Sequence, residues 1–295
     1  MTERRFRSIL AGWVVLGLAT SPPARAAAPA PVSLARDGPW VANYDDDSCQ
    51  LLAKFGMGSA AIIARFTRYQ PSDSFDLALT GESLERPGPT AKVKLAFGPA
   101  QPEREAFAIV GTVSDKPLLI FNSQRLDGWE RSFGRKDEPP PAVTPAQEAA
   151  VSTLTVRLGG KRNYRLELGP MDKPMAAMRT CMDNLLTHWG YDPKAIAAQS
   201  RAATPVGSPG DWVLSADYPS KAVMMGHNGL IQFRLDLDAA GKVLGCHVLA
   251  RTNPDEFADV SCRALTRRAR FEPALDATGK PVKSFYINKI RFVIP

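Results

Sequence analysis

The sequence predicts an α+β protein with two folded domains, a larger β-rich domain followed by a smaller domain that contains both strands and a helix. The chain has 295 residues, 44% of them hydrophobic, which is enough for two cores at ~100–150 residues per domain. Short runs of β-branched and aromatic residues, divided by Gly, Pro and Asp, fill residues 40–168. A second alternating pattern begins at residue 229 and is followed by a helical one.

The first 26 residues have the three-part pattern of a secretory signal peptide. Arginines at positions 4, 5 and 7 precede an apolar run over residues 9–19, and small residues follow at 24–28. We expect cleavage after Ala26 or Ala28. The apolar run holds about a dozen residues, whereas a helix needs roughly 20 to cross a bilayer, although retention as a short anchor is the alternative. We therefore expect an exported chain with no stable membrane span after cleavage.

The charge of the exported part argues against a nucleic-acid partner. Residues 1–26 carry four of the 37 basic and one of the 30 acidic residues, so residues 27–295 keep 33 and 29, a net charge of +4. A charge this small, spread over so long a chain, does not predict the basic surface that phosphate binding needs.

The β-rich domain is expected over residues 36–192 as an antiparallel sandwich or barrel with a closing helix. Residues 27–33 are rich in Ala and Pro and are interpreted as a flexible lead-in, with structure starting near Trp40. Turn residues separate the expected strands, which span 60–66, 74–79, 92–97, 107–113, 118–122, 153–158 and 164–168. Helices are expected at 145–150 and 174–189. The longer helix has one apolar stripe, formed by Met178, Cys181, Met182 and Leu185.

The four cysteines are expected to form two disulfides, because their number is even and the chain leaves the reducing cytoplasm. Cys181 lies on the apolar stripe of the 174–189 helix, so a bond to Cys49 would join the two ends of the first domain. Cys246 and Cys262 lie on a strand and a helix that can pack on each other. Their bond would close a loop of about 15 residues and contribute roughly 3 kcal/mol. Metal binding is the alternative, but no Cys-x-x-Cys pair or histidine cluster supports it, and we expect no metal.

Residues 193–210 are rich in Ala, Ser, Pro and Gly and form the expected linker to a second domain at 211–295. Apolar residues at 231, 233, 235 and 237 alternate with polar ones and predict a strand, and a Gly-containing turn leads into a second strand over 242–250. A helix over 255–268 has acidic residues in its first turn and arginines near its end, as the helix dipole favours. A final strand at 284–294 completes a β-β-α-β order.

Several short motifs make this second domain similar to a known family. They are Tyr218-Pro219 with Ala222, Gly229 at the start of a strand, Gly241-Lys242-Val243 in a turn, Phe271-Glu272-Pro273-Ala274, Gly279-Lys280-Pro281-Val282, and Ile290-Arg291-Phe292 in the last strand. In this order they resemble the C-terminal domain of the energy transducer TonB and its relatives. The resemblance covers about residues 211–295 and does not extend to the β-rich domain.

The resemblance implies a protein-binding module in the periplasm of a Gram-negative bacterium. Domains of this family bind an extended peptide of a TonB-dependent outer-membrane receptor by adding it as a strand to a sheet edge. This places Tyr218 and Pro219 near the contact and assigns the edge to the last strand, with Ile290, Arg291 and Phe292. The partner is then an outer-membrane or periplasmic protein. Because the family's N-terminal membrane helix and long Pro-rich spacer are missing from the sequence, we expect a binding or adaptor role rather than energy transduction.

The second hypothesis is an enzyme or ligand-binding site in the β-rich domain, docked through the TonB-like domain. His188, His227 and His247 share no motif, and a disulfide at Cys246 would remove the thiol beside His247. The acidic run at 45–47 lacks the further oxygen ligands of a calcium loop. We therefore expect no catalytic residues and no cofactor. A polar pocket with ionisable groups within residues 40–190 would favour the second hypothesis, and a filled apolar interior would favour the first.

Overall fold

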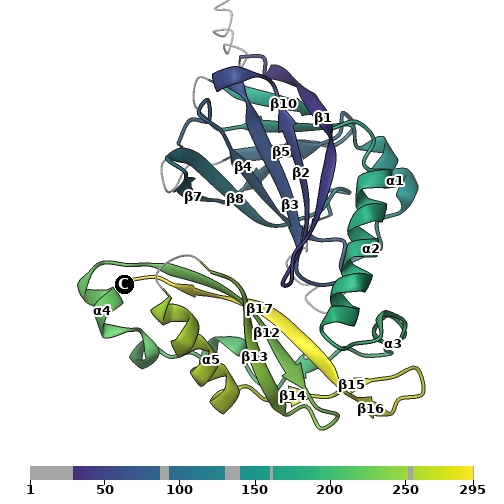
Figure 1. Cartoon of the computed structure of the whole chain (residues 1–295), viewed down its shortest axis with the longest axis vertical. Coiled ribbons are helices and arrows are strands. Elements are labelled where there is room, and N and C mark those ends of the chain that lie inside the picture. Colours follow the sequence, from purple (N-terminus) through teal and green to yellow (C-terminus); the bar gives the residue numbers. More distant parts are fainter. Residues whose placement is uncertain (1–28, 87–92, 130–139, 160–161, 252–254, 295) are drawn as a thin grey trace, which may run out of the picture.

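The computed structural model describes residues 29–86, 93–129, 140–159, 162–251 and 255–294. The predicted signal peptide lies outside these residues. Two separate hydrophobic cores hold the buried apolar side chains, and the two regions that contain them lie one above the other in Figure 1. Among the described residues, no helix has both the length and the apolar character needed to cross a membrane. The fold mixes α and β structure with strands predominating, in agreement with the predicted α+β class.

The first region is a ten-stranded sheet that nearly closes into a barrel (Figure 1). Its strands are β1 (Val32–Tyr44), β2 (Cys49–Phe55), β3 (Ile62–Arg68), β4 (Phe75–Thr80), β5 (Val93–Phe97), β6 (Arg104–Ala106), β7 (Ala108–Val113), β8 (Lys116–Gln124), β9 (Thr153–Arg157) and β10 (Asn163–Glu167). Their order in the sheet is β6-β5-β9-β10-β1-β2-β3-β4-β8-β7. The two terminal strands, β6 and β7, are separated in sequence by Phe107 alone, so the chain itself connects one end of the sheet to the other. Of the two predicted architectures, the structure adopts the barrel-like one.

The core of this region is built by side chains that alternate along each strand. On β2 the buried residues are Cys49, Leu51, Ala53 and Phe55. They share one face because successive side chains of a strand point to opposite sides. The largest fully buried side chains of the region are Phe55, Phe66, Phe97 and Phe121. The apolar interior is therefore filled by aromatic and aliphatic groups.

Strand β1 begins earlier than the predicted start of the domain. It starts at Val32, inside the segment interpreted as a flexible lead-in, and its residues 32–35 pair in parallel with β10. Leu34 is buried in the core, and the burial of this side chain stabilises the segment. After an irregularity between Asp37 and Val41, the strand pairs antiparallel with β2. A parallel pair thus enters a sheet that the sequence predicts to be antiparallel.

Two helices lie beside the barrel (Figure 1). Helix α1 spans Pro145–Ala150, as predicted, and starts with a capping box in which Thr144 and Gln147 exchange hydrogen bonds. Helix α2 spans Asp172–His188, and one stripe of it joins the core. The stripe consists of Met175, Met178, Cys181, Met182 and Leu185. A disulfide between Cys49 and Cys181, whose Cα atoms are 5.9 Å apart, ties α2 to the start of β2.

The segment predicted as a linker, residues 193–210, contains regular structure and pairs with the second region. Its elements are α3 (Pro193–Ala197), β11 (Thr204–Pro205) and a 3-10 helix at Pro209–Asp211, with another following at Ser215–Asp217. Strand β11 pairs with β14 (Phe271–Glu272), and Arg201 forms a bridge with Leu275. Backbone pairing therefore holds this connector against the second region.

The second region is a three-stranded sheet with a helix on one face. Its remaining elements are α4 (Ser220–Met224), β12 (Gly229–Leu237), β13 (Val243–Arg251), α5 (Glu256–Arg268), β15 (Ala274–Leu275), β16 (Pro281–Val282) and β17 (Ser284–Phe292). The sheet has the order β13-β12-β17, and both pairs are antiparallel. Helix α5 packs on the side that carries Ile231, Phe233 and Leu235. The disulfide between Cys246 and Cys262, with Cα atoms 5.5 Å apart, joins β13 to α5.

The turn between β12 and β13 depends on Gly241. Its φ of +79° lies in the left-handed region that favours glycine. An added Cβ would also lie only 2.1 Å from the carbonyl oxygen of Phe271. Asp238 completes the turn by accepting hydrogen bonds from the amides of Ala240 and Lys242, each at 2.9 Å. The glycine of this motif therefore has a structural role.

Candidate peptide-binding edge

Strand β17 forms one edge of the second sheet. It pairs with β12 along its whole length, from Ser284 opposite Leu237 to Phe292 opposite Gly229. No strand in the described part of the chain pairs with its outer side. In an antiparallel sheet, every second residue of such an edge points its N–H and C=O groups outward. Outward groups that have no partner within the chain are available for pairing with another strand.

A groove of about 570 Å³ follows the first half of this edge. One side is formed by four consecutive residues of β17, Ser284, Phe285, Tyr286 and Ile287. Because side chains alternate across a strand, a surface lined by consecutive residues follows the strand edge rather than one face of the sheet. The groove therefore lies where a strand could be added.

The face of the sheet opposite α5 packs against the first region. Phe285 contacts Trp189 and Tyr191 edge-on, with ring centroids 6.0 and 5.1 Å away. Further along β17, the Lys289 ammonium group lies 2.6 Å from the carboxylate of Asp76, a residue of β4. Both charged side chains are largely buried, so salt screens this ion pair less than it screens an exposed one. These contacts hold the edge strand in a defined position.

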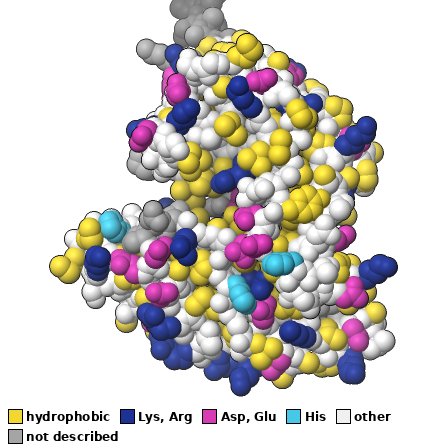
Figure 2. Space-filling view, in the orientation of Figure 1, with side chains coloured by type: hydrophobic (Ala, Val, Ile, Leu, Met, Phe, Trp, Pro, Cys, Tyr) yellow, Lys and Arg dark blue, Asp and Glu magenta, His cyan; other side chains and the backbone are white. Residues whose placement is uncertain are grey.

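Asp236 on β12 connects three side chains at the same interface. Its Oδ1 accepts hydrogen bonds from the Tyr191 hydroxyl at 2.8 Å and from Arg234 Nε at 3.0 Å, and its Oδ2 lies 2.7 Å from His247 Nε2. The Arg234 guanidinium also lies over the Trp189 ring, 4.1 Å from its centroid. Burial, followed by the hydrogen bond to Asp236, raises the pKa of Tyr191, so the hydroxyl stays protonated as a donor. Figure 2 shows acidic and histidine side chains gathered where the two regions meet.

Three of the predicted partner-binding residues lie around an aromatic cluster near α4. The Tyr218 ring contacts Phe257 and Phe292 edge-on, with centroids 5.5 Å apart in each pair. Its hydroxyl donates a hydrogen bond to the carbonyl of His227 at 2.5 Å. Pro219 immediately precedes α4, and Phe292 is buried at the end of β17. The structure thus brings Tyr218 and the last strand together, as members of one core.

The other two predicted residues lie near the end of β17. Ile290 is half-buried against the second core, and Arg291 is exposed on the strand. Sequence reasoning missed the residues that position the edge, among them Tyr191, Phe285 and Lys289. Lys289 and its partner Asp76 are 213 residues apart, and neither belongs to a recognisable motif. No local signal in the sequence could have found this contact.

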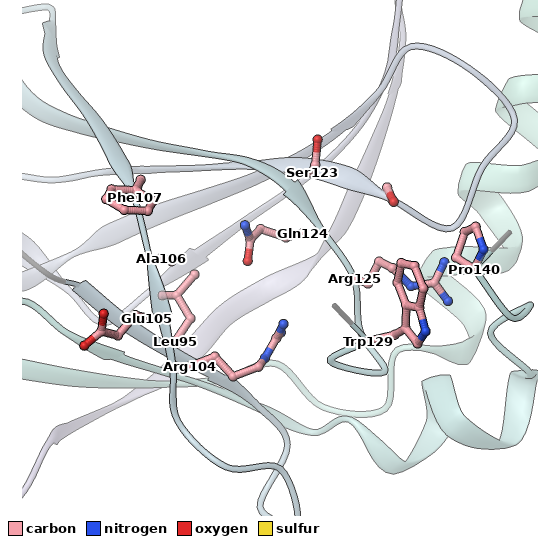
Figure 3. A pocket seen from close by; sticks show the side chains of 11 residues that line it. Leu95, Arg104, Glu105, Ala106, Phe107, Ser123, Gln124, Arg125, Trp129 and Pro140 are labelled. Atoms are coloured by element: carbon pink, nitrogen blue, oxygen red, sulfur yellow. The ribbon is translucent and has the colours of Figure 1, made fainter. Parts of the chain in front are cut away.

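A pocket of about 500 Å³ in the β-rich region is the alternative site (Figure 3). Arg104 and Gln124 point into it. Arg125 also lines it, but its guanidinium lies 2.6 Å from the carboxylate of Asp127. Burial would raise the pKa of Asp127, yet hydrogen bonds from the Arg125 side chain and the Trp129 amide outweigh burial and lower it. The charge of Arg125 is therefore compensated within the protein.

The three histidines lie on elements that do not line this pocket. His188 lies at the end of α2, His227 before β12 and His247 on β13. Cys246 is bonded to Cys262 and has no free thiol. Within the described residues, no three His, Cys, Asp or Glu side chains are grouped to hold a metal ion. The pocket lining carries charges of both signs, with Arg104 and Arg125 on one side of the balance and Glu105 on the other, together with polar groups such as Gln124.

Comparison with known proteins assigns a family to the second region. A search of curated proteins finds no match to the chain. Residues 215–294 match the family described as Gram-negative bacterial TonB protein C-terminal. Domains of this family are non-enzymatic protein-interaction modules that contact outer-membrane proteins. The resemblance seen in the sequence motifs is confirmed, and residues 215–294 are a TonB-type C-terminal domain.

Proposed function

We propose that this protein is a periplasmic binding module of a Gram-negative cell envelope, and that its TonB-type domain captures an extended peptide of an envelope partner by strand addition to β17. The observation that carries the proposal is the outer edge of β17, which has no strand partner in the described residues and borders a groove. A peptide pairing there would satisfy the outward N–H and C=O groups of the edge. The two disulfides fit an oxidising compartment such as the periplasm.

The β-rich region acts in this proposal as a rigid support for the edge strand. Its packed core and its contacts with Phe285 and Lys289 hold β17 in place before any partner arrives. An edge that is already ordered loses less conformational entropy on binding than a mobile one. The support therefore favours affinity without touching the partner's backbone.

One residue of β17 offers a direct test of strand addition. The amide of Lys289 donates to Asn288 Oδ1 at 2.8 Å and so points away from β12. The amide of Ile287, two residues earlier, points the same way because the orientation alternates along the strand. Ile287→Pro removes this outward donor, whereas Ile287→Val keeps it together with most of the side chain.

The experiment uses the protein spanning residues 27–295, immobilised and incubated with outer-membrane extract. Bound proteins are quantified by mass spectrometry. We expect the wild type and the Ile287→Val variant to capture the same proteins, and the Ile287→Pro variant to lose them. Unchanged capture by a folded Ile287→Pro variant would exclude strand addition at this edge and would leave β13, the opposite edge of the sheet, as the remaining site.

The pocket in Figure 3 favours a second function, the binding of a small polar ligand by the β-rich region. Its volume of about 500 Å³ lies in the usual range for ligand sites, and Arg104 and Gln124 supply polar contacts. We expect a member of a panel of small polar compounds, both charged and neutral, to raise the melting temperature of the protein. The increase should disappear in the Gln124→Ala variant. A panel that leaves the melting temperature of the wild type unchanged would contradict this function.

A further inference from the structure

The groove beside β17 has walls from both regions of the molecule. One wall is the edge of β17 at residues 284–287. The facing wall comes from α2, α3 and the loop after β3, and it includes Pro71, Asp183, Leu186 and Ile196. All four of these residues lie outside residues 215–294, which match the TonB family. The groove is therefore a property of the whole chain and not of the TonB-type domain alone.

Tyr191 holds the two walls at a fixed separation. Its backbone amide donates to the carbonyl of Leu186 at 2.9 Å, and its hydroxyl, whose one proton is shared with Asp236 Oδ1, lies 2.9 Å from the carbonyl oxygen of Ser284. Leu186 and Ser284 line opposite sides of the groove. The Tyr191 ring also contacts Phe285 and is itself buried. Tyr191 does not line the groove, but its contacts connect Leu186 and Ser284, one residue from each wall.

The walls differ from each other in chemistry. The edge of β17 supplies backbone donors and acceptors, and the facing wall supplies apolar surface from Pro71 and Ile196, while Leu186 is almost fully buried. Asp183 is the one acidic or basic side chain among the described lining residues. It is exposed, and no described residue forms an ion pair with it. A single unpaired carboxylate beside an apolar surface is complementary to a single basic side chain.

We infer that the groove binds an extended apolar peptide segment carrying one lysine or arginine, with β17 pairing its backbone and Asp183 pairing its basic side chain. The inference rests on the proposed strand addition and adds the chemistry of the partner. Ser284 is buried and its carbonyl accepts from Tyr191, so residues 285–287 form the accessible edge. At about 3.4 Å each, these residues give a contact of roughly 10 Å, which suits a segment of about three residues. Selectivity then comes from the β-rich region, while the backbone contacts come from the TonB-type domain.

The first test selects ligands without assuming their sequence. A phage library of random heptapeptides is panned against the protein spanning residues 27–295, and the same library is panned against the Asp183→Lys variant. We expect the wild type to select apolar peptides with one basic residue, and the variant to select peptides with an acidic residue at the same place. Selection of the same sequences by both proteins, or of none by the wild type, would overturn the inference.

The second test measures affinity for the selected peptide by fluorescence polarisation. Asp183→Asn should weaken binding about two- to fivefold, as expected for a surface ion pair. Asp183→Lys should weaken it about tenfold or more, and a peptide with glutamate in place of its basic residue should recover the loss. Asp259→Asn is the matched control, because Asp259 is an exposed acidic residue on α5 that does not line the groove. The Asp259→Asn variant should bind the selected peptide with the same affinity as the wild type.

Two further variants separate this inference from the proposed function. Ile196→Trp should block the groove from the side of α3, and Ile287→Pro should remove the pairing edge. Loss of binding with Ile287→Pro but with neither Ile196→Trp nor Asp183→Lys would preserve strand addition and overturn the inference. Light scattering adds a last check on the oligomeric state. If the wild type is a dimer and Ile287→Pro makes it a monomer, the occupant of the groove is a second copy of the chain. That outcome would also overturn the inference.

Discussion

The two sheets of this protein differ in what becomes of their edges. In the β-rich region the end strands β6 and β7 are joined through Phe107, and the sheet nearly closes. In the TonB-type domain the three-stranded sheet is open, and the outer side of β17 has no strand partner among the described residues. Closure removes the unpaired backbone groups that invite another strand, whereas an open edge keeps them. Under the proposed function, the nearly closed sheet is the support and the open edge is the binding region.

The largest effect should come from the disulfides, whose loops differ greatly in length. The Cys49–Cys181 bond spans 132 residues and the Cys246–Cys262 bond spans 16. By loop entropy they contribute about 5 and about 3 kcal/mol, respectively. Replacing each pair by alanine and following unfolding by calorimetry should therefore destabilise the β-rich region more than the TonB-type domain. If removal of the Cys246–Cys262 bond lowered stability more than removal of the Cys49–Cys181 bond, the β-rich region would not be the one that depends more on its disulfide.

A smaller effect is expected from the contact between the two regions. Phe285→Ala removes the ring that packs on Trp189 and Tyr191. Because Phe285 is half-buried, we expect a loss of about 2 kcal/mol, below the range for a fully buried phenylalanine. Phe107→Ala is the control, since that ring is 92% exposed and its loss should change stability by less than about 0.5 kcal/mol. Equal effects of the two variants would mean that the interface does not couple the regions.

Acid should weaken both regions through one carboxyl group in each. In the TonB-type domain, a hydrogen bond from Arg268 lowers the pKa of Asp217, and in the β-rich region Arg125 and the Trp129 amide lower the pKa of Asp127 against the effect of burial. A lowered folded pKa gives stability that is present above the unfolded value of about 3.9 and is lost as pH falls through the folded value. Melting temperatures measured from about pH 6 to pH 2 should therefore fall with acid.

Asparagine variants assign this acid dependence to each region. Asp217→Asn should reduce the dependence of melting temperature on pH for the TonB-type domain alone. Asp127→Asn should reduce it for the β-rich region alone. The reason is that each of the two ion pairs, Asp217 with Arg268 and Asp127 with Arg125, lies within one region. Calorimetry at several pH values separates the two transitions. If either variant flattened the pH dependence of both transitions equally, the regions would unfold as one unit and the comparison between them would lose its basis.

The smallest effect on stability should come from Arg291. Its side chain is exposed near the open end of β17, and Arg291→Ala should change the free energy of unfolding by less than about 0.5 kcal/mol. Chemical denaturation measures this change. A loss above about 1 kcal/mol would assign Arg291 a structural role in place of the partner contact that the TonB resemblance implies.

Local patterns in the sequence account for much of the second region. The alternation around Ile231, Phe233 and Leu235 predicts β12, and the glycine turn places β13 beside it. Helix α5, which runs from Glu256 to Arg268, is indicated by acidic residues at its start and basic residues at its end. These features depend on residues within a few positions of each other, where backbone preference and side-chain periodicity act directly.

The start of the first region shows where such patterns fail. Residues 27–33 have an Ala/Pro-rich composition that predicts a flexible lead-in, yet β1 begins at Val32. Its first residues pair with β10, more than 130 positions away, for example Leu34 with Leu166. The ordering of this segment depends on a partner strand that no local pattern reveals, because burial of Leu34 requires the whole core to form.

The sequence by itself determined the α+β class, the main helices, the hairpin of β12 and β13 and the family of residues 215–294. Only the tertiary structure decided the near closure of the barrel, the placement of Tyr191 between Leu186 and Ser284, and the groove along β17. The physical reason is the distance along the chain. Propensity, capping and periodicity act over a few residues, whereas the groove requires α2, α3 and β17 to meet, and packing of the folded chain is what brings them together.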